Sequence, residues 1–168
     1  MKRQIIISII FLLPILAMAH GEHHENLENA HKDSIANGEN NYHRDELLRK
    51  INKSYTNSIK QIFQEKCYNC HSNQTKYPWY YPIPGIRQLI DHDIKDALEH
   101  LDFTNDFPFA GHGTPKEDLE ELIEVVDEDS MPPWQYLIMH RDHKLSSDEK
   151  NDIILWAESS LNLLSAQK

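Results

Sequence analysis

The sequence predicts an all-α fold, and three observations lead to this expectation. Apolar residues recur at spacings of three and four along several segments, as they do on one face of an α-helix. Some of those segments begin with a capping box, the sequence pattern that opens many helices. No segment alternates polar and apolar residues in the manner of a strand. The 168 residues therefore suit one helical domain preceded by an N-terminal tail.

The N-terminus has the pattern of a secretory signal peptide, which we assign to residues 1–19. Lys2 and Arg3 precede an apolar run over residues 5–16, and the triplet AMA at residues 17–19 fits a cleavage site. The apolar run is shorter than the roughly 20 residues that cross a membrane. We therefore expect cleavage after Ala19, export to the periplasm and no stable membrane insertion.

Residues 20–43 are rich in Asn, Glu and His and lack apolar periodicity. Such a segment cannot bury enough apolar surface to offset the entropy lost on ordering, so it is predicted to be a disordered leader. Histidine-rich tracts can bind divalent metal ions, although incidental weak binding is the simpler interpretation here. The histidines concerned are His20, His23, His24, His31 and His43.

An amphipathic helix is predicted from Arg44 to the vicinity of Cys67. Its apolar stripe comprises Leu48, Ile51, Tyr55, Ile59, Ile62 and Phe63. Proline and glycine then exclude regular structure from much of residues 72–85. A second helix is predicted from Ile86 to Leu101, with an apolar face formed by Leu89, Ile90, Ile94, Leu98 and Leu101.

Capping boxes predict the starts of two further helices. The first box is TPKE at residues 114–117, with proline at the first helical position, and Leu119, Leu122, Ile123 and Val126 follow it. The second is SSDE at residues 146–149, and Ile153, Trp156, Ala157, Leu161 and Leu164 follow it. The intervening MPPWQYLIMHRDHK, residues 131–144, is predicted to be a loop. Residues 44–168 thus form the predicted domain.

The charge balance limits the partners that the chain could bind. Asp and Glu number 27 against 17 Lys and Arg, which gives a formal net charge of −10. Such a chain is repelled by nucleic acid and by anionic lipid. We therefore expect no nucleic-acid binding, and a protein partner with a basic docking surface.

The two cysteines of the chain, Cys67 and Cys70, stand immediately before His71 in the sequence CYNCH. On a helix, residues i, i+3 and i+4 share one face, so both thiols and the imidazole would point into the same space. Both sulfurs could then form thioethers with the vinyl groups of a haem, and His71 could bind its iron. The motif predicts one covalently attached haem c.

Other interpretations of the cysteine pair fit the sequence less well. A thiol–disulfide oxidoreductase places C-x-x-C at a helix N-terminus, which lowers the thiol pKa, whereas this pair follows a helix. A structural zinc site needs four protein ligands, and no second pair is suitably spaced. A structural disulfide across so short a loop would constrain the unfolded chain very little.

Met131 is the predicted distal iron ligand. Pro132 biases it towards extended backbone, and a thioether ligand favours reduced iron and electron transfer. His140 is the main rival for this position, and His112 is a weaker one. An open or labile distal site would instead suit a module that binds or senses a small ligand.

Several aromatic side chains could shield a haem from water. Trp79, Tyr80 and Tyr136 are expected to line its pocket. Arg87 could pair with a haem propionate, although a surface position is the simpler expectation. His92 and His100 fall on the second predicted helix, where we expect them to be solvated or to have local partners.

These residues together resemble the haem-binding domain family, a group of exported single-haem proteins related to class I cytochromes c. The resemblance covers about residues 55–162, and residues 103–113, FTNDFPFAGHG, depart from the family pattern. It rests on Cys67, Cys70, His71-Ser72-Asn73, Thr75, Pro78-Trp79-Tyr80, Met131-Pro132-Pro133, Tyr136, His140, Leu145-Ser146, Glu149 and Trp156. The resemblance implies a helical c-type cytochrome fold, iron binding by the motif histidine and distal ligation from the MPP loop.

The sequence as a whole predicts a periplasmic mono-haem c-type cytochrome that transfers one electron. We find no acid–base constellation in it, so no enzymatic activity is expected. The expected partners are a redox protein and the cytochrome c maturation machinery. A ligand-binding haem module and a thiol–disulfide oxidoreductase are the alternatives.

Overall fold

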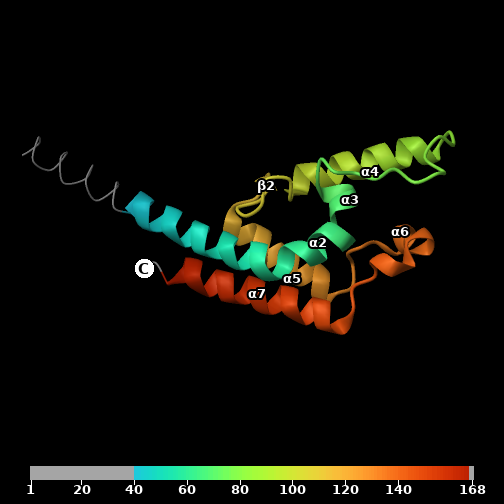
Figure 1. Ribbon diagram of the computed structural model, residues 1–168. Coiled ribbons are helices and arrows are strands. Elements are labelled where there is room, and N and C mark those ends of the chain that lie inside the picture. The colour runs from blue at the N-terminus through green and yellow to red at the C-terminus, as the bar shows by residue number, and fades with distance from the viewer. Residues whose placement is uncertain (1–39, 167–168) are drawn as a thin grey trace, which may run out of the picture. The chain divides into compact units, whose positions relative to one another are not determined.

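The computed structural model describes residues 40–166, and these residues are mostly helical, which confirms the all-α prediction (Figure 1). Residues 41–168 form one compact unit of the chain. The predicted signal peptide and most of the predicted leader lie outside the described residues. None of the described helices is both long and apolar enough to cross a membrane.

The first long helical segment begins at residue 40 rather than at Arg44. Residues 40–54 are α-helical, the π-turn η1 (Tyr55–Ile59) follows, and α2 (Lys60–Lys66) completes the segment. Residues 40–43, which we assigned to the leader, contain neither Gly nor Pro, so no residue there breaks the helix. The expected apolar stripe is confirmed, because Ile51, Tyr55, Ile59 and Phe63 are buried.

Helix α4 (Ile86–His100) begins at the predicted residue and ends one residue earlier than predicted, and it packs less than expected. Gly85 lies at its N-cap with φ of 88°, a conformation that glycine adopts without strain. No residue of α4 is buried, and Leu89 on its predicted apolar face is 56% exposed. Ile90, Ile94 and Leu98 on the same face are half-buried, so the rest of the chain covers this face only in part.

The expectation that no strand would form was wrong, because α4 leads into a short antiparallel ladder. It joins β1 (Leu101–Asp102) to β2 (Ala110–Gly111), with Leu101 opposite Gly111. Gly111 has φ of 134°, and a Cβ there would collide with the carbonyl of His100. A two-residue strand is too short to produce detectable alternation in the sequence.

Helices α5 (Pro115–Asp127) and α7 (Ser147–Ser165) begin where the capping boxes predicted. Thr114 accepts from the backbone N–H of Glu117, and Ser146 accepts from that of Glu149. These bonds satisfy amide groups that the first helical turn leaves free. In Figure 1, α5 and α7 run alongside the first helical segment and form a bundle with it.

The predicted loop over residues 131–144 contains two short helices, so that expectation was wrong. They are α6 (Trp134–Met139) and the 3₁₀ turn η2 (Arg141–His143). The residues of α6 after Pro133 include no helix breaker. A six-residue helix is too short for its periodicity to be recognised.

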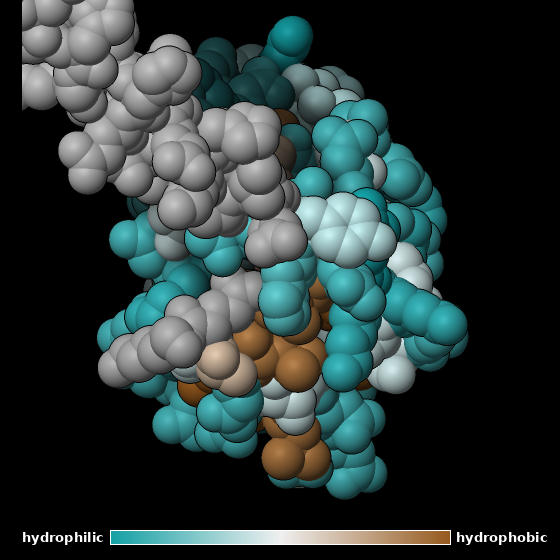
Figure 2. All heavy atoms as spheres, turned by 90° about the vertical axis from the view of Figure 1, so that its left-hand side faces the viewer, coloured by the Kyte–Doolittle hydropathy of each residue, from teal (hydrophilic) through white to brown (hydrophobic). Residues whose placement is uncertain are grey.

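Aromatic side chains dominate the core. Tyr55 contacts Phe63 edge-on at a ring-centroid distance of 5.6 Å and Phe109 at 5.2 Å. Such edge-to-face pairs add to the energy of burial. The core comprises Ile51, Tyr55, Ile59, Phe63, Tyr68, Leu101, Phe103, Phe107, Phe109, Leu119, Leu122, Val126, Leu145, Ile153, Trp156 and Ala157. Figure 2 views the end of the bundle at which α7 terminates, where mainly hydrophilic side chains surround a smaller apolar area.

Candidate haem site

The CYNCH motif lies where α2 passes into the four-residue helix α3 (Tyr68–His71). The backbone N–H of Cys67 donates to the carbonyl oxygen of Phe63 at 2.8 Å, which continues the hydrogen-bond pattern of α2. The N–H groups of Cys70 and His71 both donate to the carbonyl of Cys67, at 3.1 and 3.0 Å. Because the backbone is helical across the motif, its three functional side chains share one face.

The imidazole of His71 is held in one tautomer. Its Nδ1 lies 2.7 Å from the carbonyl oxygen of Leu101, the first residue of β1. A carbonyl can only accept, so Nδ1 carries the proton and Nε2 keeps its lone pair. Burial lowers the pKa of His71, although the carbonyls of Leu101 and Ala97 oppose this effect. A neutral imidazole with a free Nε2 is the form that binds a metal.

Both cysteines are free thiols, and burial keeps them protonated. Burial raises the pKa of Cys67 to about 12, and burial is also the main cause of the raised pKa of Cys70. A thiol–disulfide oxidoreductase needs a thiol whose pKa is lowered. The electrostatic environment of this pair is therefore unfavourable for that alternative.

Exposed apolar side chains lie on the two helices beyond the motif. Figure 1 shows α4 and α6 extending from the end of the bundle at which α3 lies. On α6, Trp134 is 68% exposed, and Ile138 and Met139 are each 55% exposed. Apolar surface of this kind is costly unless something covers it, and a porphyrin needs apolar cover. The residues present thus fit a haem at this end of the molecule.

A hydrogen-bonded cluster joins the motif to α6 and η2. Asn69, between the two cysteines, donates from Nδ2 to the hydroxyl of Tyr136 at 2.9 Å. That hydroxyl also lies 2.6 Å from Nδ1 of His143, and the Tyr136 ring stacks on His140 at 4.3 Å. His140 in turn bonds through Nε2 to the hydroxyl of Tyr80, at 2.9 Å. The sequence predicted Tyr80 and Tyr136 near the motif but gave no signal for Asn69 or His143.

Trp79 and Arg87 lie apart from this cluster's hydrogen bonds. Trp79 is 80% exposed and touches Tyr80 edge-on, with ring centroids 5.6 Å apart. Arg87 lies 3.5 Å from Asp91 in an exposed ion pair and over the ring of Tyr81. Arg87 therefore has the surface position that was the simpler expectation.

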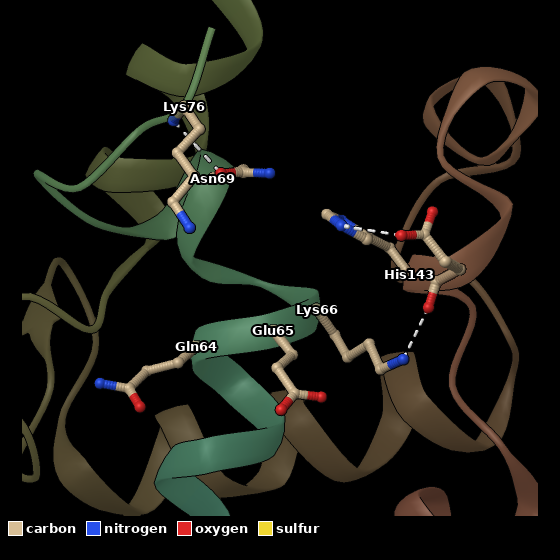
Figure 3. Close-up of a pocket in the computed structure, with 7 residues that line it drawn as sticks. Gln64, Glu65, Lys66, Asn69, Lys76 and His143 are labelled. Atoms are coloured by element: carbon tan, nitrogen blue, oxygen red, sulfur yellow. Dashed lines mark hydrogen bonds and ion pairs between the residues drawn. The ribbon is translucent and has the colours of Figure 1, made fainter. Parts of the chain in front are cut away.

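A cavity of about 440 Å³ beside the motif is lined by polar residues and does not suit a porphyrin (Figure 3). Lys66 lines this cavity, and its Nζ donates to the carbonyl oxygen of Asp142 at 2.6 Å. Asn69 borders it opposite His143, so the cavity lies beside the Asn69–Tyr136 bond. Its lining is Gln64, Glu65, Lys66, Asn69, Lys76, Asp142 and His143.

Met131 lies in the α5–α6 connection with 43% of its surface exposed. It borders a separate cavity of about 230 Å³, whose lining includes Trp134 and Leu137 but no residue of the CYNCH motif. The structure therefore does not group Met131 with His71, and ligation by Met131 stays a prediction.

The rival distal ligands have other partners. Nε2 of His140 bonds to Tyr80, and burial is the main reason why the pKa of His140 is lowered. His112 bonds through Nε2 to Nδ1 of His100 at 2.8 Å, outside the motif. Among residues 40–166, no three His, Cys, Asp or Glu side chains are placed to hold a metal ion together. The zinc alternative thus finds no ligand set there.

Comparison with curated proteins finds similarity to the cytochrome c peroxidase Ccp of Escherichia coli (strain K12). The two sequences are 32% identical over 106 residues, which cover 61% of this chain. The match covers only 23% of that peroxidase, so the chain spans less than a quarter of its relative's length. No solved structure matches the fold.

A family model described as a haem-binding domain matches residues 33–159. The match contains the CYNCH motif, the β1–β2 ladder, the MPP segment and the cluster around Tyr136. It spans most of the chain and agrees with the neutral, free Nε2 of His71 beside two free thiols. The chain therefore belongs to the haem-binding domain family, and its cofactor is haem.

Proposed function

We propose that the protein is a periplasmic mono-haem c-type cytochrome that transfers one electron at a time. The observation that carries this proposal is the hydrogen bond from His71 Nδ1 to the Leu101 carbonyl, beside two free thiols. It presents one nitrogen lone pair and two thiols from a single helical face. Haem, when bound, supplies the one-electron chemistry.

The chain's own residues would hold the haem on its proximal side. Cys67 and Cys70 tether it through thioethers, and His71 binds the iron through Nε2. Leu101 fixes the plane of the imidazole and makes it more basic by accepting the Nδ1 proton, as outer-shell partners of ligand histidines do. The maturation machinery would form the thioethers.

On the distal side we propose Met131 as the iron ligand. Its exposed side chain is available, and the prolines that follow, Pro132 and Pro133, limit the backbone freedom lost on ligation. A six-coordinate iron with a thioether ligand suits electron transfer rather than ligand binding. The net charge of −10 favours a redox partner with a basic docking surface.

The distal assignment can be tested on protein matured by a cytochrome c assembly system. Met131→Ala is expected to abolish the near-infrared methionine–iron band while the haem stays attached. Met139→Ala is the matched control, because this methionine is also exposed, and it should keep the band. A band that survives in Met131→Ala would transfer the distal role to another residue, with His140→Ala as the next variant.

The similarity to a cytochrome c peroxidase favours a second candidate function, a haem domain that serves peroxide reduction. In this case the distal site would open to peroxide instead of holding a sixth ligand. Steady-state reduction of hydrogen peroxide by the purified protein, with an electron donor, distinguishes the two possibilities. Electron transfer alone predicts no turnover above free haem, whereas a peroxidase predicts turnover that rises with peroxide concentration.

A further inference from the structure

The β1–β2 ladder brings together two histidines that the haem site does not use. His100 ends α4 immediately before β1, and His112 follows β2 directly. Leu101 lies opposite Gly111 in the ladder, so His100 and His112 are each the chain neighbour of one residue of this pair. Their rings meet with centroids 4.6 Å apart, and Nδ1 of His100 lies 2.8 Å from Nε2 of His112.

We propose that His100 and His112 form a binding site for a divalent transition-metal ion such as Zn²⁺, Cu²⁺ or Ni²⁺. Imidazole nitrogens are the preferred protein ligands of these ions, with metal–nitrogen distances of about 2.0–2.1 Å for Zn²⁺. Two nitrogens already in hydrogen-bond contact need only a small increase in separation to bind one ion between them. Water would complete the coordination.

The backbone around the pair favours such a chelate. A Cβ at Gly111 would collide with the carbonyl of His100, so the two segments approach as closely as the backbone allows. The approach fixes the backbone of one histidine relative to that of the other before any ion arrives. A preorganised pair loses less side-chain entropy on binding than two independent histidines.

A buried carboxylate beside the pair adds a second, independent observation. Asp118 is 3% exposed, and its Oδ2 has no hydrogen-bond partner. Its Oδ1 lies so close to Gly113, the neighbour of His112, that a Cβ there would collide with it. Burial raises the pKa of Asp118, and the charge of His112 counteracts that effect. A cation held at His112 would therefore stabilise a carboxylate whose Oδ2 lacks a hydrogen-bond partner.

The pair is also accessible. Both histidines are exposed, and their mutual hydrogen bond is at the surface. A metal ion could enter without any opening of the fold. The site differs from the haem site in its ligands, because neither histidine belongs to the CYNCH motif.

The test is a metal titration of the full-length holoprotein, followed by thermal unfolding. An ion that binds only the native pair should raise Tm by about 5 °C or more once its concentration far exceeds the dissociation constant. His100→Gln and His112→Gln should each abolish the rise, because a two-residue chelate needs both imidazoles. His92→Gln is the matched control, since His92 is another exposed histidine of α4, and it should keep the full rise.

Binding elsewhere, including the histidine-rich leader, would give equal shifts in all variants and would overturn the proposal. Absence of any shift in the wild type would overturn it too. If either Gln variant fails to fold, NMR of the wild-type histidine side chains replaces the comparison. Zn²⁺ should then shift the His100 and His112 imidazole signals together at one equivalent, and unchanged signals would refute the site.

Discussion

At the scale of single residues, the candidate site depends on partners that are distant in sequence. The shared helical face of Cys67, Cys70 and His71 was predictable because their spacing is local. Leu101 could not be predicted as the partner of His71, since a backbone carbonyl leaves no trace in residue identity. Asn69 and His143 were also missed, because their bonds to Tyr136 appear only after α6 and η2 fold against the motif.

Tyr136→Phe should destabilise the protein by about 1–3 kcal/mol, since it leaves polar groups of Asn69 and His143 without their partner. Burial raises the pKa of Tyr136 to about 12, so the hydroxyl stays neutral throughout the usual pH range. Denaturant unfolding of holoprotein measures the loss. Tyr77→Phe is the control because Tyr77 is 52% exposed, and an equal loss in both variants would contradict the role of the cluster.

Asp118 should make stability fall between about pH 4 and pH 6. Burial raises its pKa from 3.8 to about 6, so the folded protein holds this proton more tightly than the unfolded chain. Stability is then lost as pH rises through that window, by up to about 3 kcal/mol. With a metal chelator present, the free energy of unfolding should decline more in the wild type than in Asp118→Asn as the pH rises through this window. Parallel curves for the two proteins would show that the carboxyl does not titrate abnormally.

At the scale of elements, the sequence located helix starts better than it located contacts. The two capping boxes marked α5 and α7, because a cap is a local pattern of four residues. The length and apolar pattern of α4 were also predictable, but its poor burial was not. The short elements β1, β2, α6 and η2 escaped detection because each is shorter than the stretch of residues over which helical or strand periodicity can be recognised.

Helix α4 should depend on the haem for its protection from hydrogen exchange. It has no buried residue, whereas α5 buries Leu119, Leu122 and Val126. In a haem-free Cys67→Ala/Cys70→Ala/His71→Ala variant, α4 amides should exchange at least about ten times faster than in holoprotein. Amides of α5 and α7 provide the internal control and should change little. Equal protection of α4 with and without haem would place the cofactor elsewhere.

At the scale of the whole molecule, the chain combines membership of a haem-binding family with a marked negative charge. The chain belongs to the haem-binding domain family, and its formal net charge is −10. The composition predicted this electrostatic character, because charge adds up without knowledge of the fold. The composition could not predict which surface would contact a partner protein, since that depends on how α4, α6 and the bundle are arranged.

Electron transfer to a basic redox protein should slow as salt is added. Opposite net charges steer the encounter, and steering raises association rates by a factor of about 10 or more at low ionic strength. Stopped-flow rate constants over a salt series measure this, with an acidic redox protein as control, which should show the reverse trend. Rates to the basic protein that do not change with salt would exclude steering by net charge.

The most direct measurement is whether haem stays with the protein in acid and organic solvent. Protein matured with a cytochrome c assembly system is expected to remain red after extraction and to carry the mass of one haem. Cys67→Ala/Cys70→Ala should lose its haem in the same procedure. If the wild-type haem passes into the organic phase, or the matured protein carries none, covalent attachment at Cys67 and Cys70 is contradicted.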